Sequence, residues 1–179
     1  GLFAGLVLSV GLLVPRADLS MLSPGRVAAV LGSLSALFGA SLWFELRPLH
    51  RAAPPRWVEV AVLGAATAGA LALGLMPLGV PAPEAPGDWA HALPCLYGGL
   101  LLGIPIYGLL RALDRGGRAL SAFLAAAGAA LAANAALALH CDNDALPHLL
   151  RGHAPIVLVY VALVAAWRGA SRRVLHAPH

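Results

Sequence analysis

Apolar residues form six runs along this chain, and most of the charged residues gather in the short segments between them. A helix needs about 20 residues to cross a hydrocarbon core about 30 Å thick, and most of these runs approach that length. We therefore predict an all-α membrane protein with six transmembrane helices, in which residues 1–179 form a single membrane domain. The predicted helices cover residues 1–14, 27–44, 57–78, 92–110, 119–139 and 155–167.

The composition favours a membrane protein over a soluble one. Hydrophobic residues make up 60% of the chain and charged residues only 11%, and the mean hydropathy is +0.81. A soluble domain carries about 25% charged residues, so this chain has too few charges to coat a soluble globule. All 12 basic residues are Arg, and together with the abundant Ala, Gly and Pro this suggests a GC-rich bacterial genome.

The arginines are distributed unevenly between the two sides of the predicted membrane domain. Cytoplasmic segments of membrane proteins carry an excess of positive charge. Nine arginines follow the second, fourth and sixth predicted helices, namely Arg47, Arg51, Arg56, Arg111, Arg115, Arg118, Arg168, Arg172 and Arg173. We therefore predict that these segments and both chain termini are cytoplasmic, in a bacterial inner membrane, and that the other segments are external.

Small residues mark two of the predicted helices, 57–78 and 119–139. In lipid, helices associate through close backbone approach, which small residues permit, so we predict that these two helices are central in the bundle. Asn134 lies inside the second of them, where we expect it to face another helix and form a structural hydrogen bond. No charged residue lies in the middle of a predicted span, which argues against an ion-coupled transporter.

Cysteine and histidine residues gather at the predicted external side. His140, Cys141, His148 and His153 follow the fifth helix in a segment assigned to a loop, and Cys95 lies near the external start of the fourth helix. Thiolate and imidazole are ligands suited to Zn or another transition metal. Three further residues are auxiliary candidates that complete or orient such a site: His91, Asp142 and Asp144.

Three interpretations of this external group remain open from the residues alone. The group could bind a metal, and Cys95 and Cys141 could instead form a disulfide in an oxidising compartment if their Cα atoms approach within about 7 Å. The third interpretation is a polar cap at the level of the lipid headgroups, with no ligand.

The predicted cytoplasmic side presents a basic surface. Its main residues are Arg47, Arg51, Arg111, Arg115 and Arg118. Attraction to anionic lipid explains such a surface, and docking of an acidic partner protein is the alternative. Because topology accounts for the positive charge, we expect no direct contact with nucleic acid. The sequence contains no recognisable nucleophile–base triad, P-loop or pair of catalytic carboxylates, so we do not expect an enzyme.

Several stretches resemble the NrsF family, membrane-bound negative regulators of an extracytoplasmic-function sigma factor. The resemblance lies in Pro15 to Leu19, similar to an R-x-D-L turn, in Cys95-Leu96, and above all in Leu139-His140-Cys141, similar to an L-H-C signature. The chain departs from the family pattern after Cys141, where His148 and His153 indicate a divergent branch tuned to a metal.

The resemblance implies an anti-sigma factor for a stress response. Its cytoplasmic face would hold a sigma factor away from RNA polymerase, and metal or redox sensing at Cys95, His140 and Cys141 would release it, with His148 and His153 as auxiliary ligands. The rival hypothesis is a small structural or cofactor-anchoring subunit of a membrane complex, which holds haem or a metal on the same residues.

Overall fold

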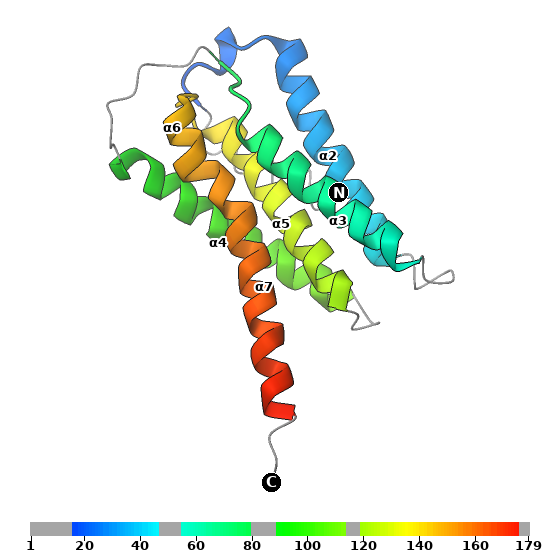
Figure 1. The fold of residues 1–179 in the computed structure, drawn as a ribbon. Coiled ribbons are helices and arrows are strands. Elements are labelled where there is room, and N and C mark those ends of the chain that lie inside the picture. Colours follow the sequence, from blue (N-terminus) through cyan, green and yellow to red (C-terminus); the bar gives the residue numbers. More distant parts are fainter. Residues whose placement is uncertain (1–15, 47–54, 80–88, 114–118, 176–179) are drawn as a thin grey trace.

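The computed structural model describes residues 16–46, 55–79, 89–113 and 119–175, and this part of the chain is helical with no strand. Figure 1 shows long helices arranged side by side as a bundle. The elements are η1 (Leu19–Met21), α2 (Pro24–Leu46), α3 (Arg56–Gly74), α4 (Trp89–Leu113), α5 (Ala119–His140), α6 (Leu146–His148), η3 (Leu149–His153) and α7 (Ala154–Leu175). The predicted all-α class is therefore confirmed for the described residues.

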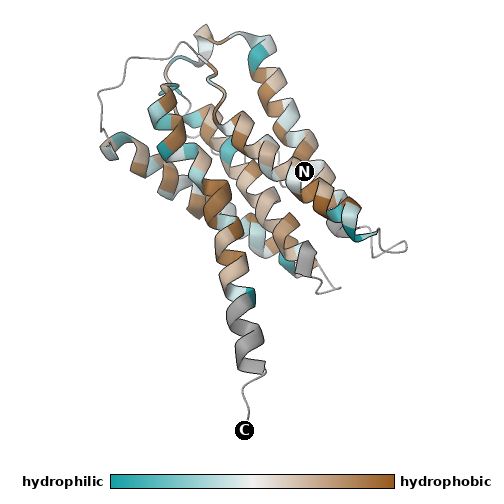
Figure 2. Cartoon of the chain, viewed as in Figure 1, coloured by the Kyte–Doolittle hydropathy of each residue, from teal (hydrophilic) through white to brown (hydrophobic). Residues whose placement is uncertain are grey.

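Four helical segments are long and apolar enough to cross a membrane. They cover Arg56–Gly74, Trp89–Leu113, Ser121–His140 and Leu146–Arg168, and α2 contributes a shorter apolar stretch, Pro24–Ala40. Apolar residues dominate all of these segments in Figure 2. The first predicted helix, residues 1–14, lies outside the described residues.

The predicted loop before the last helix is wrong. The structure is helical from Leu146 onward, through α6 and η3 into α7, so His148 and His153 belong to a helical segment. Ala145 is extended and precedes the helix as its N-cap, and Pro147 occupies the first turn, where a missing N–H costs nothing. The polar residues of this segment suggested a loop, but two of them, His148 and His153, are buried.

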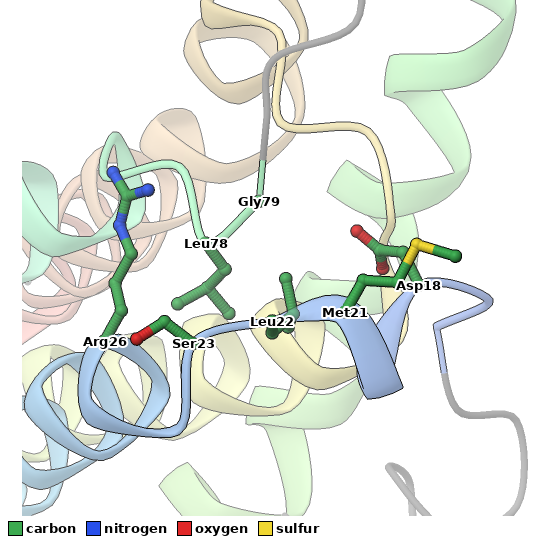
Figure 3. Close-up of a pocket in the computed structure, with 7 residues that line it drawn as sticks. All are labelled: Asp18, Met21, Leu22, Ser23, Arg26, Leu78 and Gly79. Atoms are coloured by element: carbon green, nitrogen blue, oxygen red, sulfur yellow. The ribbon is translucent and has the colours of Figure 1, made fainter.

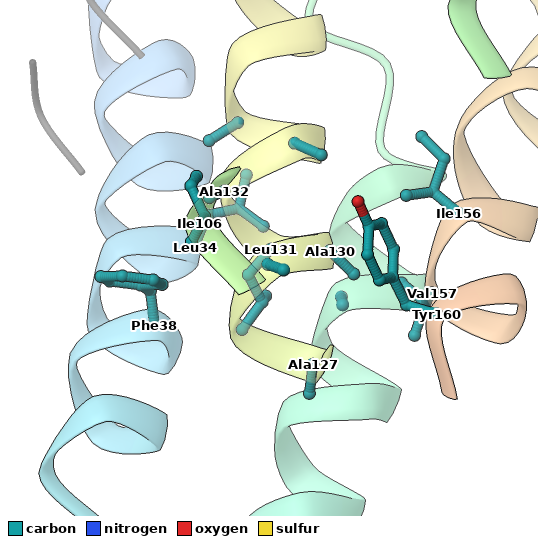
Figure 4. Packing of buried hydrophobic residues seen from close by; sticks show 14 of the residues in the cluster. Leu34, Phe38, Ile106, Ala127, Ala130, Leu131, Ala132, Ile156, Val157 and Tyr160 are labelled. Carbon is teal, nitrogen blue, oxygen red and sulfur yellow. The ribbon is translucent and has the colours of Figure 1, made fainter. Parts of the chain in front are cut away.

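Helix α5 forms the centre of the bundle, as predicted. Within its apolar window 83% of residues are buried, compared with 22% for α3. The buried core includes Ala127, Ala130 and Leu131 of α5 together with Leu34 of α2 and Ile156 of α7 (Figure 4). Alanine surrounds α5 on every side, so α2, α3, α4 and α7 can all contact it.

The prediction that α3 is also central is wrong. Its small buried residues, Ala66, Ala70 and Gly74, are spaced four apart and define a single stripe. One stripe of small residues permits close approach on one side only. Other small residues of α3, such as Gly64 and Ala65, are exposed, so α3 is a peripheral helix of the described bundle.

The helix ends that carry the Cys and His residues lie together at one end of the bundle, which we call the site end. Figure 1 shows the start of α2, the end of α3, the start of α4, the end of α5 and α6 at this end. The opposite ends of these helices lie away from it. This alternation agrees with the up-and-down order that short connections impose on a helix bundle.

Helices α4 and α7 meet closely at a glycine. Tyr160 is buried, and its hydroxyl donates a hydrogen bond to the Leu100 carbonyl. A Cβ added at Gly103 would lie 2.6 Å from Tyr160 Cζ, which is too close for the ring to remain in place. Gly103 therefore permits the contact between the two helices.

We predict that Gly103→Ala destabilises the protein by about 1–3 kcal/mol, the usual cost of overpacking a core. Thermal unfolding in detergent measures this effect. Gly98→Ala and Gly108→Ala are matched controls in the same helix, because a Cβ there meets nothing within 4 Å. Equal melting temperatures for all three variants would contradict the assignment.

Candidate metal centre

Four potential metal ligands converge at the site end of the bundle. Cys95 comes from the second turn of α4, Cys141 directly follows α5, His148 ends α6 and His153 ends η3. Each residue offers one ligand atom, and these atoms all lie within 4.8 Å of one another. Segments far apart in the sequence thus bring two thiols and two imidazoles to one point.

Two distances within this group are close to those of a tetrahedral metal site. Cys95 Sγ lies 3.5 Å from Cys141 Sγ, and Cys141 Sγ lies 3.1 Å from His148 Nε2. Zinc bonds of about 2.3 Å to sulfur and about 2.0–2.1 Å to nitrogen place tetrahedral ligand atoms about 3.3–3.8 Å apart. The group could therefore hold a metal ion after small side-chain movements.

A π-helical turn brings the two histidines to the same side. In an α-helix, residues five apart such as His148 and His153 would lie about 140° apart around the axis. In η3 the Ala154 N–H donates to the Leu149 carbonyl, five residues back. This wider turn lets the rings meet edge to face, with centroids 5.5 Å apart. π-helical turns occur frequently at functional sites.

Gly152 allows this turn to lie against α4. A Cβ at Gly152 would lie 3.1 Å from the Ala92 carbonyl oxygen and 3.3 Å from Cys95 Cβ. Sequence reasoning missed both Gly152 and the π-helical turn. The available signal was a glycine between two histidines in an otherwise apolar helical segment.

Hydrogen bonds favour the thiolate form of Cys141. The Cys95 thiol donates to Cys141 Sγ and lowers the pKa of Cys141, although burial acts in the opposite direction. Hydrogen bonds from His148 and His153 lower this pKa further. A thiolate is the form of cysteine that binds metals, so this environment is suited to a cation.

The other predicted ligands lie outside this group of four. His91 is exposed in the first turn of α4, His140 is exposed at the end of α5, and Asp142 is exposed in the segment that follows. Asp144 is buried but binds Arg16 instead.

The predicted cytoplasmic surface lies largely beyond the residues described. Arg111 is half-buried in the last turn of α4. The remaining members, Arg47, Arg51, Arg115 and Arg118, lie outside the described residues.

A buried ion-pair network lies beside the group of four. The side chain of Arg16 is 0% exposed, and its guanidinium donates to Asp144 Oδ2 at 2.6 Å and to Asp18 Oδ1 at 2.6 Å. The same guanidinium donates to the Ala138 carbonyl at 3.3 Å, and the Arg16 N–H donates to the Leu139 carbonyl at 3.1 Å. The segment before α2 is thereby attached to the end of α5.

Asp144 extends this network to the end of α3. Its carboxylate accepts hydrogen bonds from the backbone N–H groups of Leu78 and Gly79, at 3.1 and 2.6 Å. A pocket of about 330 Å³ adjoins this network, and Figure 3 shows Asp18 and Leu78 among the residues that line the pocket. The segments before α2, after α3 and after α5 are therefore held together next to the candidate metal centre.

Arg16 also determines how the network responds to acid. Its hydrogen bond lowers the pKa of Asp18 below the ordinary value of 3.8. A lowered carboxyl pKa contributes stability above the unfolded-state pKa, and this contribution is lost as the pH falls through the folded-state pKa. The Arg16–Asp18 pair therefore persists to a lower pH than the ordinary aspartate pKa of 3.8 would allow.

No protein-family profile, curated protein or solved structure matches this chain. The chemistry of the group of four and the sequence patterns are therefore the basis for a functional proposal.

We predict that Asp144→Ala destabilises the protein by about 3–5 kcal/mol, because it leaves the buried Arg16 guanidinium with only one carboxylate, Asp18, beside it. Asp142→Ala is the matched control: it removes an exposed carboxylate two residues away and should change stability by less than about 0.5 kcal/mol. Denaturant unfolding in detergent compares the two variants. Similar losses in both would show that the network does not stabilise the site end.

Proposed function

We propose that this chain is a membrane-bound regulator that binds zinc or another transition metal at Cys95, Cys141, His148 and His153. The convergence of their four ligand atoms within 4.8 Å is the observation that carries the proposal. The donor set supports zinc, because two thiolates and two imidazoles form a closed structural site of this metal. A bound ion would neutralise the thiolate charge and join α4, the end of α5 and the π-helical turn.

The proposed topology has six transmembrane helices and both termini in the cytoplasm of a bacterial inner membrane. The excess of Arg in alternate connecting segments supports this orientation. The metal centre then faces the external side, where metal ions and oxidants arrive.

The proposed output is the release of an extracytoplasmic-function sigma factor from the cytoplasmic side. Its support is the resemblance of Pro15 to Leu19 and of Leu139 to Cys141 to the NrsF family, together with the basic cytoplasmic segments. A ligand shifts such an equilibrium only if it binds one state more tightly than the other. Metal binding, or oxidation of the two thiols to a disulfide, would provide that difference.

The rival proposal, a haem-anchoring subunit, has less support from the geometry. A haem ring must fit between two axial histidines. The His148 and His153 rings meet edge to face at 5.5 Å, and two cysteines share the same group. This arrangement suits a single ion better than a macrocycle.

We predict that the purified protein binds one zinc ion per chain and that Cys141→Ser, His148→Ala and His153→Ala each abolish stoichiometric binding, as measured by elemental analysis after equilibration with zinc. The ligands must be deprotonated, so acidification should release the metal. His140→Ala is the control that keeps the ion, because His140 lies outside the group of four. Loss of zinc in this control but not in His153→Ala would refute the proposed ligand set.

We also predict that a sigma factor co-purifies with the full chain from bacterial membranes and is released on treatment with zinc or a thiol oxidant. A double variant, Cys95→Ser with Cys141→Ser, should still hold the sigma factor but no longer release it. Immunoprecipitation with mass spectrometry measures both steps. If the chain binds zinc but no sigma factor co-purifies with it, the proposed metal centre stands and the proposed anti-sigma output is contradicted.

A further inference from the structure

Asn134 places an amide group deep inside the bundle. The residue is 2% exposed, and neither its Oδ1 nor its Nδ2 has a hydrogen-bond partner among the described residues. It faces α3, as predicted, since a Cβ at Gly74 would lie 3.3 Å from Asn134 Oδ1. The predicted hydrogen bond from Asn134 to a neighbouring helix is not formed within the described part of the chain. Burial of an amide without a hydrogen-bond partner is unfavourable, so this position calls for a physical explanation.

His153 carries a second buried polar atom of the same kind. One nitrogen of its ring forms a hydrogen bond with Cys141, inside the group of four. Its Nε2 is buried and has no hydrogen-bond partner within the described part of the chain. The contact with Cys141 is therefore made by Nδ1, and Nε2 is the nitrogen directed away from that contact.

A small cavity connects these two groups. Asn134 and His153 both line it, together with Cys141 and Asp144, and its volume is about 10 Å³. About 10–15 Å³ is the space that one water molecule requires. Buried waters form about three hydrogen bonds to polar groups that otherwise lack partners, and Asn134 and His153 provide such groups here.

We propose that one water in this cavity joins the Asn134 amide to His153 Nε2, which makes Asn134 a positioning residue of the metal centre. When the metal is bound and His153 no longer donates to Cys141, the water accepts the Nε2–H and donates to Asn134 Oδ1. With its proton on Nε2, the ring presents the lone pair of Nδ1 to the metal. Histidine ligands in metal sites almost always donate their second N–H to such a partner, which fixes the tautomer and the ring orientation. The inference rests on the proposed metal-binding function.

The test compares zinc affinity in wild-type protein and in Asn134→Leu, which replaces the amide with an apolar group of the same branching. Loss of an outer partner of a histidine ligand typically weakens metal binding 10–100-fold, and we expect a loss in this range by competition with a chromophoric chelator. The metal-free melting temperature should not fall, because the substitution replaces a buried amide that has no direct hydrogen bond to a described residue with an apolar side chain. The absorption spectrum of bound Co²⁺ should change as His153 reorients.

Ser121→Ala is the matched control on the same helix. Ser121 is also buried, but 13 residues at 1.5 Å per residue place it about 20 Å from Asn134. Its zinc affinity and Co²⁺ spectrum should equal those of the wild type.

A second pair of variants keeps the test decisive if Asn134→Leu does not fold. Asn134→Ser and Asn134→Ala are similar in size and differ in one hydroxyl, which can replace the amide as the partner of the water. We expect the Ser variant to bind zinc more tightly than the Ala variant.

The outcomes separate the two proposals. Wild-type zinc affinity in Asn134→Leu, or equal affinities in the Ser and Ala variants, would overturn the role of Asn134 and leave the metal centre intact. A wild-type chain that binds neither zinc nor Co²⁺ would overturn both. Weakened binding with a lower melting temperature in every Asn134 variant, and an unchanged Co²⁺ spectrum, would reduce Asn134 to a packing residue.

Discussion

The close approach of four helices to α5 is the constraint on which the rest of the structure depends. Lipid tails are as apolar as the helices they surround, so burial of apolar surface provides little force between helices in a membrane. Dispersion contacts and a few buried polar interactions must hold the bundle together. Because alanine covers α5 on all sides, its neighbours reach its backbone, and 83% of its apolar window is buried. The position of Cys141 follows directly, since α5 ends immediately before it.

The buried guanidinium of Arg16 imposes a second constraint at the site end. A charge removed from water is stable only with close counter-charges and hydrogen-bond acceptors. Asp18, Asp144 and the Ala138 carbonyl supply them. Asp144 lies between Cys141 and His148 in the sequence, so the attachment of Asp144 to Arg16 limits the path of the chain between two members of the group of four. The network therefore restrains the segment that joins Cys141 to His148.

The sequence predicted the parts of the fold that depend on apolar periodicity and residue size. Helix 119–139 and its central position could be predicted from its alanines, because small residues on every face permit close contact whichever helices lie beside it. The role of α3 could not be predicted in this way, because it also carries small residues around the helix but buries only one stripe of them, and the count of small residues does not show which are buried.

The site was predicted in its chemistry but not in its geometry. Cysteine and histidine side chains identified Cys95, Cys141, His148 and His153, because few other residues bind soft metals. The π-helical turn was not predictable, since α-helical geometry places His148 and His153 on different faces. Asp142 and Asp144 were equivalent in the sequence, and only the position of Arg16 in the fold distinguishes the buried carboxylate from the exposed one.

The course of α4 bears on how the proposed regulator would transmit a signal. Cys95 lies near its start and Arg111 in its last turn, 16 residues or about 24 Å along the axis. Pro94 and Pro105 lie inside this helix, and each removes one hydrogen bond from the ladder. A helix weakened at these two points can bend there while the intervening turns move as a unit. Movement of Cys95 toward a metal, or into a bond with Cys141, would pivot α4 near Pro94. The close contact of Gly103 with Tyr160, and the hydrogen bond from Tyr160 to the Leu100 carbonyl, would then couple that pivot to α7.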